Sequence, residues 1–372
     1  MLPEEIVTKK AELIHYGKIY IPKDLTLPYY PSKSTAGPGA GSRAMVFSFF
    51  GTRVKLAIVR DAPAIFSLTR KQMKDVQQNS QTQQGTSAES KTVERRCVSG
   101  NPYMILKNGD PFLDEVSIEP TIMHAPRQAF INITSECIYN CSFCVTPSLH
   151  RGQKECTVNR WIELILVHAN NSNLDAVAIT SGVAESPHKT VLDMVQIIKA
   201  VRAKLPEMPI GVEPYLTSNE DVDLLYDAGA IELKINLETP NQEIFDKICP
   251  GMDYEGISEV LRYAVSIFGR NQVCSNLIVG LNESDDDILR VVEELAKDGI
   301  VANLRALRLN EHNEPKLTAA LGFTPKPVEP ERMLILAKSQ KQILDKYGLS
   351  TTKFKTMCHR CKSCDIVPQQ DI

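Results

Sequence analysis

The sequence lacks three features that would each announce a partner or a location. No uninterrupted apolar run reaches the roughly 18 residues that a membrane-spanning helix needs. Charge is not of one sign, because 42 Lys and Arg stand against 45 Asp and Glu, and binders of nucleic acid usually carry a basic patch. The start, MLPEEIVTKKAELIHYGK, has no secretory apolar core. We therefore expect a cytoplasmic protein with no nucleic-acid and no membrane partner.

Cysteine is what the sequence does have. Ten cysteines in a chain without an export signal favour metal binding or reactive thiols over a disulfide framework. Six of the ten fall in two tight triplets, CIYNCSFC at 137–144 and CHRCKSC at 358–364. These two triplets are the main functional signal in the sequence.

The N-terminal third, residues 1–126, is predicted to be a β-containing accessory region. Two β-rich runs flank Gly51-Thr52, and an Asn108-Gly109 turn separates two further apolar runs, so each pair favours a hairpin. Residues 71–95 are rich in Gln and Ser and nearly free of large apolar side chains. That composition predicts a flexible insert.

From residue 127 to about 325, short apolar runs alternate with amphipathic segments. Six strand-like runs separated by helices predict an α/β fold with successive βα units, a partial (β/α)6 barrel of the TIM type. A doubly wound open sheet is the alternative, and both folds place chemistry at the C-terminal ends of the strands. Residues 326–372 are expected to form a C-terminal helix and a cysteine-bearing tail.

The first triplet follows directly on the first strand-like run, QAFINIT. Cys137, Cys141 and Cys144 can hold three corners of an iron-sulfur cubane, whereas a tetrahedral zinc ion wants a fourth ligand. An iron without a protein ligand can bind a substrate or a cofactor. A structural zinc loop with a distant fourth ligand is the alternative interpretation.

This loop resembles the motif of the radical S-adenosylmethionine (radical SAM) superfamily, Cys-x3-Cys-x-aromatic-Cys after the first barrel strand. Cys137, Cys141, Phe143 and Cys144 match it position by position. The resemblance covers roughly residues 127–310. It implies that the three cysteines bind a 4Fe-4S cluster and that S-adenosylmethionine occupies the fourth iron.

Three later strand ends extend the resemblance. Thr180-Ser181-Gly182 stands where the superfamily contacts the methionyl amine, although the Gly-Gly-Glu form is absent. Residues 236–239, NLET, look like the ribose-binding Asn-Leu-Asp-Thr of biotin synthase, and residues 278–283, IVGLNE, resemble its adenine segment. The resemblance implies cofactor contacts at Phe143, Ser181, Gly182, Asn236, Glu238, Val279 and Gly280.

The second triplet has the spacing Cys-x2-Cys-x2-Cys of the bacterial ferredoxin run, but Pro368 falls where the last cysteine would be. Cys358, Cys361 and Cys364 therefore predict an auxiliary 4Fe-4S cluster, with zinc as the alternative. Its fourth ligand is open: an oxygen donor, a substrate, or one of the scattered cysteines, Cys97, Cys156, Cys249 and Cys274.

The resemblance implies an enzyme that cleaves S-adenosylmethionine to a 5'-deoxyadenosyl radical. Two clusters and the biotin synthase-like strand ends favour sulfur insertion. The whole sequence looks most like the archaeal biotin synthase-related group, which includes two-component lipoyl synthases. The implied partners are an octanoylated acyl-carrier or lipoyl-domain protein, a paired homologue, and a reductant such as ferredoxin. The alternatives are a peptide-modifying radical SAM enzyme with an electron-transfer cluster, a non-catalytic iron-sulfur electron carrier, or a zinc-stabilised interaction module.

Further polar side chains stand at two other strand ends. We expect them either to contact substrate or to form a solvated rim: Glu213, Pro214 and Tyr215 after the third strand, and Arg305, Arg308 and Glu311 at the sixth.

Overall fold

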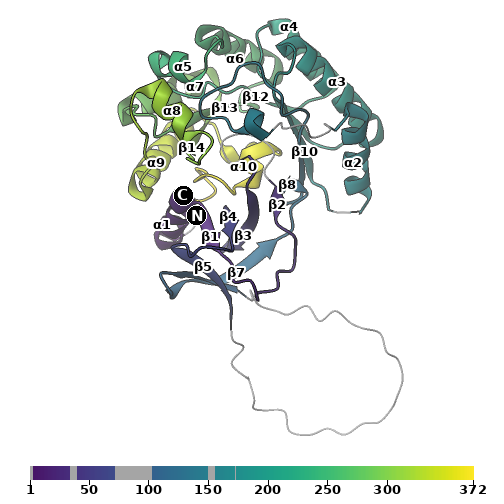
Figure 1. Ribbon diagram of the computed structural model, residues 1–372. Coiled ribbons are helices and arrows are strands. Elements are labelled where there is room, and N and C mark those ends of the chain that lie inside the picture. Colours follow the sequence, from purple (N-terminus) through teal and green to yellow (C-terminus); the bar gives the residue numbers. More distant parts are fainter. Residues whose placement is uncertain (1–2, 34–39, 72–102, 150–155, 172) are drawn as a thin grey trace, which may run out of the picture.

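The computed structural model describes residues 3–33, 40–71, 103–149, 156–171 and 173–372. Within these ranges the chain forms two sheets, one from the N-terminal third and one from residue 123 onward. Figure 1 shows the purple N-terminal unit below the teal and green barrel unit, with the yellow helix α10 between them. Residues 72–95 of the expected insert, and Cys97, lie outside the described residues.

The N-terminal unit is a small closed β-barrel with one helix. The strand order is β3-β4-β1-β5-β6-β7, and β7 returns to pair with β3, so among the described strands only β2 stands outside the ring. Both predicted hairpins are confirmed, although the first turn uses Phe50 and Gly51 at positive φ. The elements are α1 Glu4–Tyr16, β1 Lys18–Tyr20, β2 Ser32–Lys33, β3 Arg43–Phe49, β4 Thr52–Val59, β5 Phe66–Arg70, β6 Tyr103–Lys107 and β7 Asp110–Glu119.

The second sheet is an open half-barrel of parallel strands. Its order, β14-β13-β12-β11-β10-β9-β8, follows the chain without a reversal, and β8 is an antiparallel edge strand. A doubly wound sheet would reverse direction at a switch point, so the predicted partial barrel is confirmed. The strands are β8 Met123–Ala125, β9 Gln128–Asn132, β10 Ala176–Thr180, β11 Ile210–Glu213, β12 Glu232–Lys234, β13 Val273–Val279 and β14 Val301–Ala306.

Helices cover the outer face of the half-barrel (Figure 1). Several begin at a capping side chain: Ser186, Ser218 and Ser284 each accept a hydrogen bond from a backbone N–H of the first turn. No helix in the described ranges is long and apolar enough to cross a bilayer. The helices are α2 Val158–Asn171, α3 Pro187–Lys204, α4 Asn219–Ala228, α5 Gln242–Ile248, α6 Tyr254–Phe268, α7 Asp285–Asp298, α8 Glu314–Leu321, α9 Pro330–Lys346 and α10 Met357–Cys361.

Side chains alternate along the parallel strands, apolar toward the helices and largely polar toward the inside. Val177 and Ile179 belong to the outer core, whereas Thr180 faces inward with Glu213 of the neighbouring strand. Polar side chains inside a half-barrel leave space for a ligand instead of a dry core. The interior is therefore the place to look for a functional site.

The C-terminal tail, residues 350–372, docks into this interior. The Glu232 carboxylate accepts hydrogen bonds from the backbone N–H groups of Lys355 (2.6 Å) and Thr356 (2.9 Å). Gly211 makes the approach possible, because a Cβ there would lie 2.0 Å from the Thr356 Oγ1. The tail thus enters the half-barrel alongside β11 and β12 and carries the second cysteine triplet inward.

The N-terminal unit holds the other side of the tail. Lys10 of α1 is fully buried and its Nζ donates to the Asp371 carboxylate (2.7 Å), to the Lys362 carbonyl (2.9 Å) and to the Thr52 hydroxyl (3.0 Å). Thr52 in turn donates to Asp371 (2.6 Å). The tail is therefore clamped between the two units of the chain.

Candidate functional site

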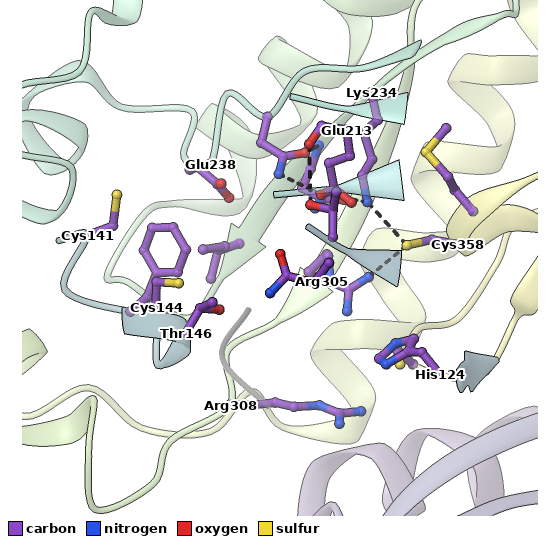
Figure 2. A pocket seen from close by; sticks show the side chains of 18 of the residues that line it. His124, Cys141, Cys144, Thr146, Glu213, Lys234, Glu238, Arg305, Arg308 and Cys358 are labelled. Atoms are coloured by element: carbon purple, nitrogen blue, oxygen red, sulfur yellow. Dashed lines mark hydrogen bonds and ion pairs between the residues drawn. The ribbon is translucent and has the colours of Figure 1, made fainter. Parts of the chain in front are cut away.

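Both cysteine triplets line one cavity of about 280 Å³ inside the half-barrel. Figure 2 shows Cys141 and Cys144 at one side of this cavity and Cys358 at the other, with strand-end side chains between them. The two triplets are separated by more than 200 residues in the sequence. The fold brings them to opposite sides of one chamber.

The first triplet occupies the loop after β9, and the neighbouring strand end braces that loop. The Gly182 N–H donates to the Thr134 carbonyl (2.9 Å), and the Ile138 N–H donates to the Val183 carbonyl (2.8 Å). A Cβ at Gly182 would lie 2.2 Å from the Glu136 carbonyl oxygen, so only glycine allows this close approach. Gly182 therefore shapes the cysteine loop as well as facing the cavity.

The thiols of this loop are unpaired and available for metal. Burial raises the pKa of Cys144 to about 11, so its thiol gives up a proton only when a metal replaces it. The Cys141 Sγ lies 3.4 Å from the Met252 Sδ. It also contacts Cys249, and this hydrogen bond together with burial raises the pKa of Cys249.

The three thiols of this loop supply the donor set of a cubane. A 4Fe-4S cluster places each thiolate on a different iron, so its three protein ligands stand farther apart than the ligands of one zinc. Cys137, Cys141 and Cys144, all lining the cavity, suit that arrangement.

The side chains expected to hold S-adenosylmethionine fall into two groups. Phe143, Ser181, Gly182, Asn236 and Glu238 line the cavity. On β13, Ile278 lines it, whereas Val279 is buried in the outer core and the Gly280 N–H donates to the Glu283 carboxylate (2.8 Å). Strand alternation explains the difference, because neighbouring residues point to opposite faces.

The protonation state of Glu238 is unusual for a glutamate. Burial, with a smaller contribution from the nearby Glu213 carboxylate, raises the pKa of Glu238 to about 8. Glu213 itself accepts from the Asn236 amide and from the Lys234 ammonium, each at 2.9 Å. At neutral pH Glu238 therefore keeps its proton, whereas Glu213 pairs with Lys234.

Two cations from the half-barrel hold the second triplet. Lys234 Nζ and Arg305 Nη1 each lie 3.3 Å from the Cys358 Sγ, as the dashed lines in Figure 2 show. Arg305 also pairs with Asp365 (3.1 Å). These two donors fix the position of the Cys358 sulfur in the cavity wall.

The other strand-end residues predicted from the sequence lie partly in the cavity and partly outside it. Arg305, Arg308, Glu213, Pro214 and Tyr215 line the cavity, whereas Glu311 lies on the exposed surface beside His312. His359 is buried and stacks on Phe354, with ring centroids 4.5 Å apart, and burial lowers its pKa to about 3.

The scattered cysteines lie in different parts of the fold. Cys249 accompanies the first triplet, Cys274 lies buried on β13 near Cys358, and Cys156 does not line the cavity.

Among the cavity side chains that sequence reasoning missed are three basic ones: Lys55, His124 and Lys234. Lys234 had a signal, because a lysine inside the apolar run IELKINLE indicates a buried charge with a dedicated partner. Lys55 comes from the N-terminal barrel and His124 from the edge strand β8, and no local sequence pattern links either residue to the cavity.

Residues 131–295 match the radical SAM superfamily. The chain therefore carries a radical SAM domain, and the superfamily predicted from the cysteine loop is confirmed. Members of this superfamily use a 4Fe-4S cluster with S-adenosylmethionine, and the cysteines at the end of β9 are the residues here that fit it.

Similar solved structures include methylornithine synthase, which is 17% identical over 60% of this chain and 69% of that chain, with a TM-score of 0.46. Coproporphyrinogen III oxidase from Escherichia coli is 16% identical over 59% of this chain and 53% of that chain, with a TM-score of 0.41. The hydrogenase maturase HydG from Carboxydothermus hydrogenoformans is 15% identical over 60% and 52%, with a TM-score of 0.40. No curated protein sequence matched the chain.

Proposed function

We propose that this protein is a radical SAM enzyme that inserts sulfur at unactivated C–H bonds and uses a cluster on the second cysteine triplet as the sulfur source. The observation that supports it is the shared cavity, since Cys358, Cys361 and Cys364 face the chamber that the first triplet also lines. A cluster used only for distant electron transfer does not need to stand beside the substrate.

The second triplet departs from the resemblance in its place along the chain. Ordinary lipoyl synthases carry their auxiliary cysteines before the barrel and biotin synthase holds its second cluster inside it, whereas this chain carries the second triplet after the barrel in sequence. The tail folds back into the half-barrel beside β11 and β12, so the triplet reaches the interior by another route. The resemblance stated for the strand ends and the location of the triplet then favour the same chemistry.

Each group of cavity residues would have its own role in the reaction. The first cluster would supply the electron that cleaves S-adenosylmethionine to methionine and a 5'-deoxyadenosyl radical. Asn236 and Glu238 would hold the ribose, and Gly182 would keep the cysteine loop against β10. Lys234 and Arg305 would hold Cys358 toward the cavity.

The proposed transfer balances in atoms and electrons. The substrate carbon loses one hydrogen atom, which leaves as 5'-deoxyadenosine, and gains one sulfur as a C–S bond forms. One electron enters from an external reductant to cleave S-adenosylmethionine, and the electron released on C–S bond formation remains on iron of the second cluster. Each sulfur inserted therefore consumes one S-adenosylmethionine and one sulfide.

The resemblance to two-component lipoyl synthases makes an octanoyl chain on a carrier-protein lysine the first substrate to test, with ferredoxin as reductant and a paired homologue present or absent. After anaerobic reconstitution we expect about eight irons per chain. A single turnover with an octanoylated lipoyl domain should give thiolated product, detected by mass spectrometry, with loss of about one cluster.

Variants separate the two sites. Cys141→Ala should abolish 5'-deoxyadenosine formation, because it removes a ligand of the first cluster. Cys361→Ala should leave about four irons and retain cleavage but give no thiolated product. Cys156→Ala, outside the cavity lining, is the matched control and should behave as the native protein. Thiolation by Cys361→Ala, or modification of a peptide without sulfur transfer, would defeat the proposal.

A further inference from the structure

The cavity lining carries four cationic side chains, and they are not equally partnered. Lys234 pairs with Glu213 at 2.9 Å and Arg305 pairs with Asp365 at 3.1 Å. The other two, Lys55 and Arg308, form no ion pair with any carboxylate among the described residues.

Arg308 leaves a buried N–H group unused. Its Nη2 is buried and has no hydrogen-bond partner in the part of the chain that the structure describes. In Figure 2 its side chain extends toward the side of the cavity where His124 lies and away from Cys141 and Cys144. A buried charged donor without a partner costs free energy, so the arrangement favours a ligand that supplies an acceptor.

Lys55 stands at the same end of the cavity. Its side chain is buried, 3% exposed, and its Nζ lies 3.0 Å from the His124 carbonyl and 3.1 Å from the His124 Nδ1. Both partners are neutral acceptors, so the lysine charge is hydrogen-bonded but not compensated by a carboxylate.

At this end of the cavity several positively charged side chains lie close together. Burial and the charges of Lys55, Arg305 and Arg308, together with Lys234, lower the pKa of His124 well below its usual range. Burial and, to a smaller extent, Arg308 lower the pKa of Lys55. A monovalent anion placed here would relieve both the mutual repulsion and the unused donor.

We propose that Arg308, assisted by Lys55, binds a carboxylate group of the substrate. A carboxylate fits better than a phosphate dianion, because the Asp365 carboxylate also lines the cavity and opposes a second negative charge. The carboxylate has two possible sources, the head group of a free aliphatic acid or an acidic side chain beside the acylated lysine of a carrier protein. This inference rests on the proposed function, which supplies the substrate class, and adds that the substrate carries a carboxylate.

The experiment measures binding without turnover. Cluster-loaded protein with S-adenosylmethionine and no reductant is titrated with octanoate and with octanamide, which differ in charge at the head group. Two octanoyl-lysine peptides are compared in the same way, one with an Asp and one with an Asn beside the lysine. We expect at least one charged ligand to bind about tenfold more tightly than its neutral counterpart.

Variants assign the preference to its residue. Arg308→Gln should remove the preference for the charged ligand and leave the dissociation constant of S-adenosylmethionine within about twofold. Arg308→Lys should keep part of the preference. Arg290→Gln is the matched control, because Arg290 pairs with Glu294 on the exposed face of α7 and should leave all constants unchanged.

Three results would overturn the assignment. Equal binding of charged and neutral ligands by the native protein would exclude a carboxylate site, and this comparison needs no variant to fold. A weaker S-adenosylmethionine affinity in Arg308→Gln, with the ligand preference intact, would assign Arg308 to the methionyl carboxylate. A preference that survives Arg308→Gln would place the site elsewhere. If sulfur insertion fails but the charge preference holds, the proposed function falls and the carboxylate site stands.

Discussion

At the scale of single residues, the cavity places charged groups where burial changes their protonation. Glu238 keeps a proton up to about pH 8 because burial disfavours its carboxylate, and Glu213 adds a like charge. A ribose offers two hydroxyl donors, so its binding would favour the ionised form. The proposed ribose contact would therefore lower the pKa of Glu238.

This protonation predicts a pH-dependent stability difference. The folded-state pKa of Glu238 is raised, so its favourable contribution is complete below the unfolded value near 4.5 and is lost as pH rises through about 8. Glu238→Gln cannot titrate. It should therefore gain about 4 kcal/mol relative to the native protein between pH 5 and pH 8.5, measured by denaturant unfolding.

Glu293→Gln is the control: hydrogen bonds from Lys346 and Tyr347 lower the pKa of Glu293, so its stability difference from the native protein should not change between pH 5 and pH 8.5. A stability difference between Glu238→Gln and the native protein that does not change with pH would contradict the prediction.

Gly182 tests the geometry of the first cysteine loop. Gly182→Ala would bring a Cβ to 2.2 Å from the Glu136 carbonyl, so the loop must shift away from β10. We expect iron after reconstitution to fall from about eight to about four per chain, with the helical content unchanged by circular dichroism.

The matched control for this loop is Gly322→Ala. That residue has a positive φ but no neighbour within 4 Å, so the substitution costs backbone strain, about 1 kcal/mol, and leaves iron binding intact. Full iron loading in Gly182→Ala would show that the close approach is not needed.

At the scale of elements, helix α1 and the C-terminal tail depend on each other through Lys10 and Asp371. Both side chains are almost completely buried, and Asp371 also accepts from the Val367 N–H (2.7 Å). Taking one partner away leaves an uncompensated buried charge, which costs more than the pair contributes. The pair therefore controls where the second triplet stands.

Lys10→Met should destabilise the protein by about 3–5 kcal/mol in denaturant unfolding and increase cleavage of the tail in limited proteolysis. Lys10→Met combined with Asp371→Leu should recover much of that loss, because the double change removes both charges. The surface pair of Lys338 and Glu4 is the control, and Lys338→Met should change stability by less than about 1 kcal/mol. Equal effects of the buried and the surface substitution would contradict this role.

At the scale of the whole molecule, the tail joins two units that have separate cores. One core lies between the half-barrel and its helices and the other fills the N-terminal barrel, while Ile366 of the tail packs in the second. Helices α1 and α9 also pack together across the boundary. Folding of the two units should therefore be coupled through the tail.

Removal of residues 357–372 tests this coupling. The deletion leaves Lys10 without Asp371 and removes the hydrogen bonds of α10 to β9. We expect differential scanning calorimetry to show two separate transitions where the full chain shows one. A single transition at an unchanged temperature would show that α1 and α9 suffice to couple the units.

The strength of the sequence prediction depended on how local each signal is. The cysteine loop after QAFINIT, the alternating βα pattern and the Asn108-Gly109 hairpin each lie within one short segment, and the structure has the corresponding elements. Val279 and Gly280 were expected at the cofactor, but alternation places Ile278 in the lining. A shift of one residue along a strand reverses the face, and a sequence motif does not fix that register.

The sequence by itself determined the superfamily and the half-barrel, because a three-thiolate loop and strand periodicity are short-range patterns. Only the tertiary structure decided that the two triplets share a cavity, that Lys55 of the N-terminal barrel and His124 of the edge strand β8 line it, and that Lys234 and Arg305 hold Cys358. Those relations arise from burial and charge pairing between segments far apart in the chain. Many chain paths are compatible with the same local patterns, and packing selects among them.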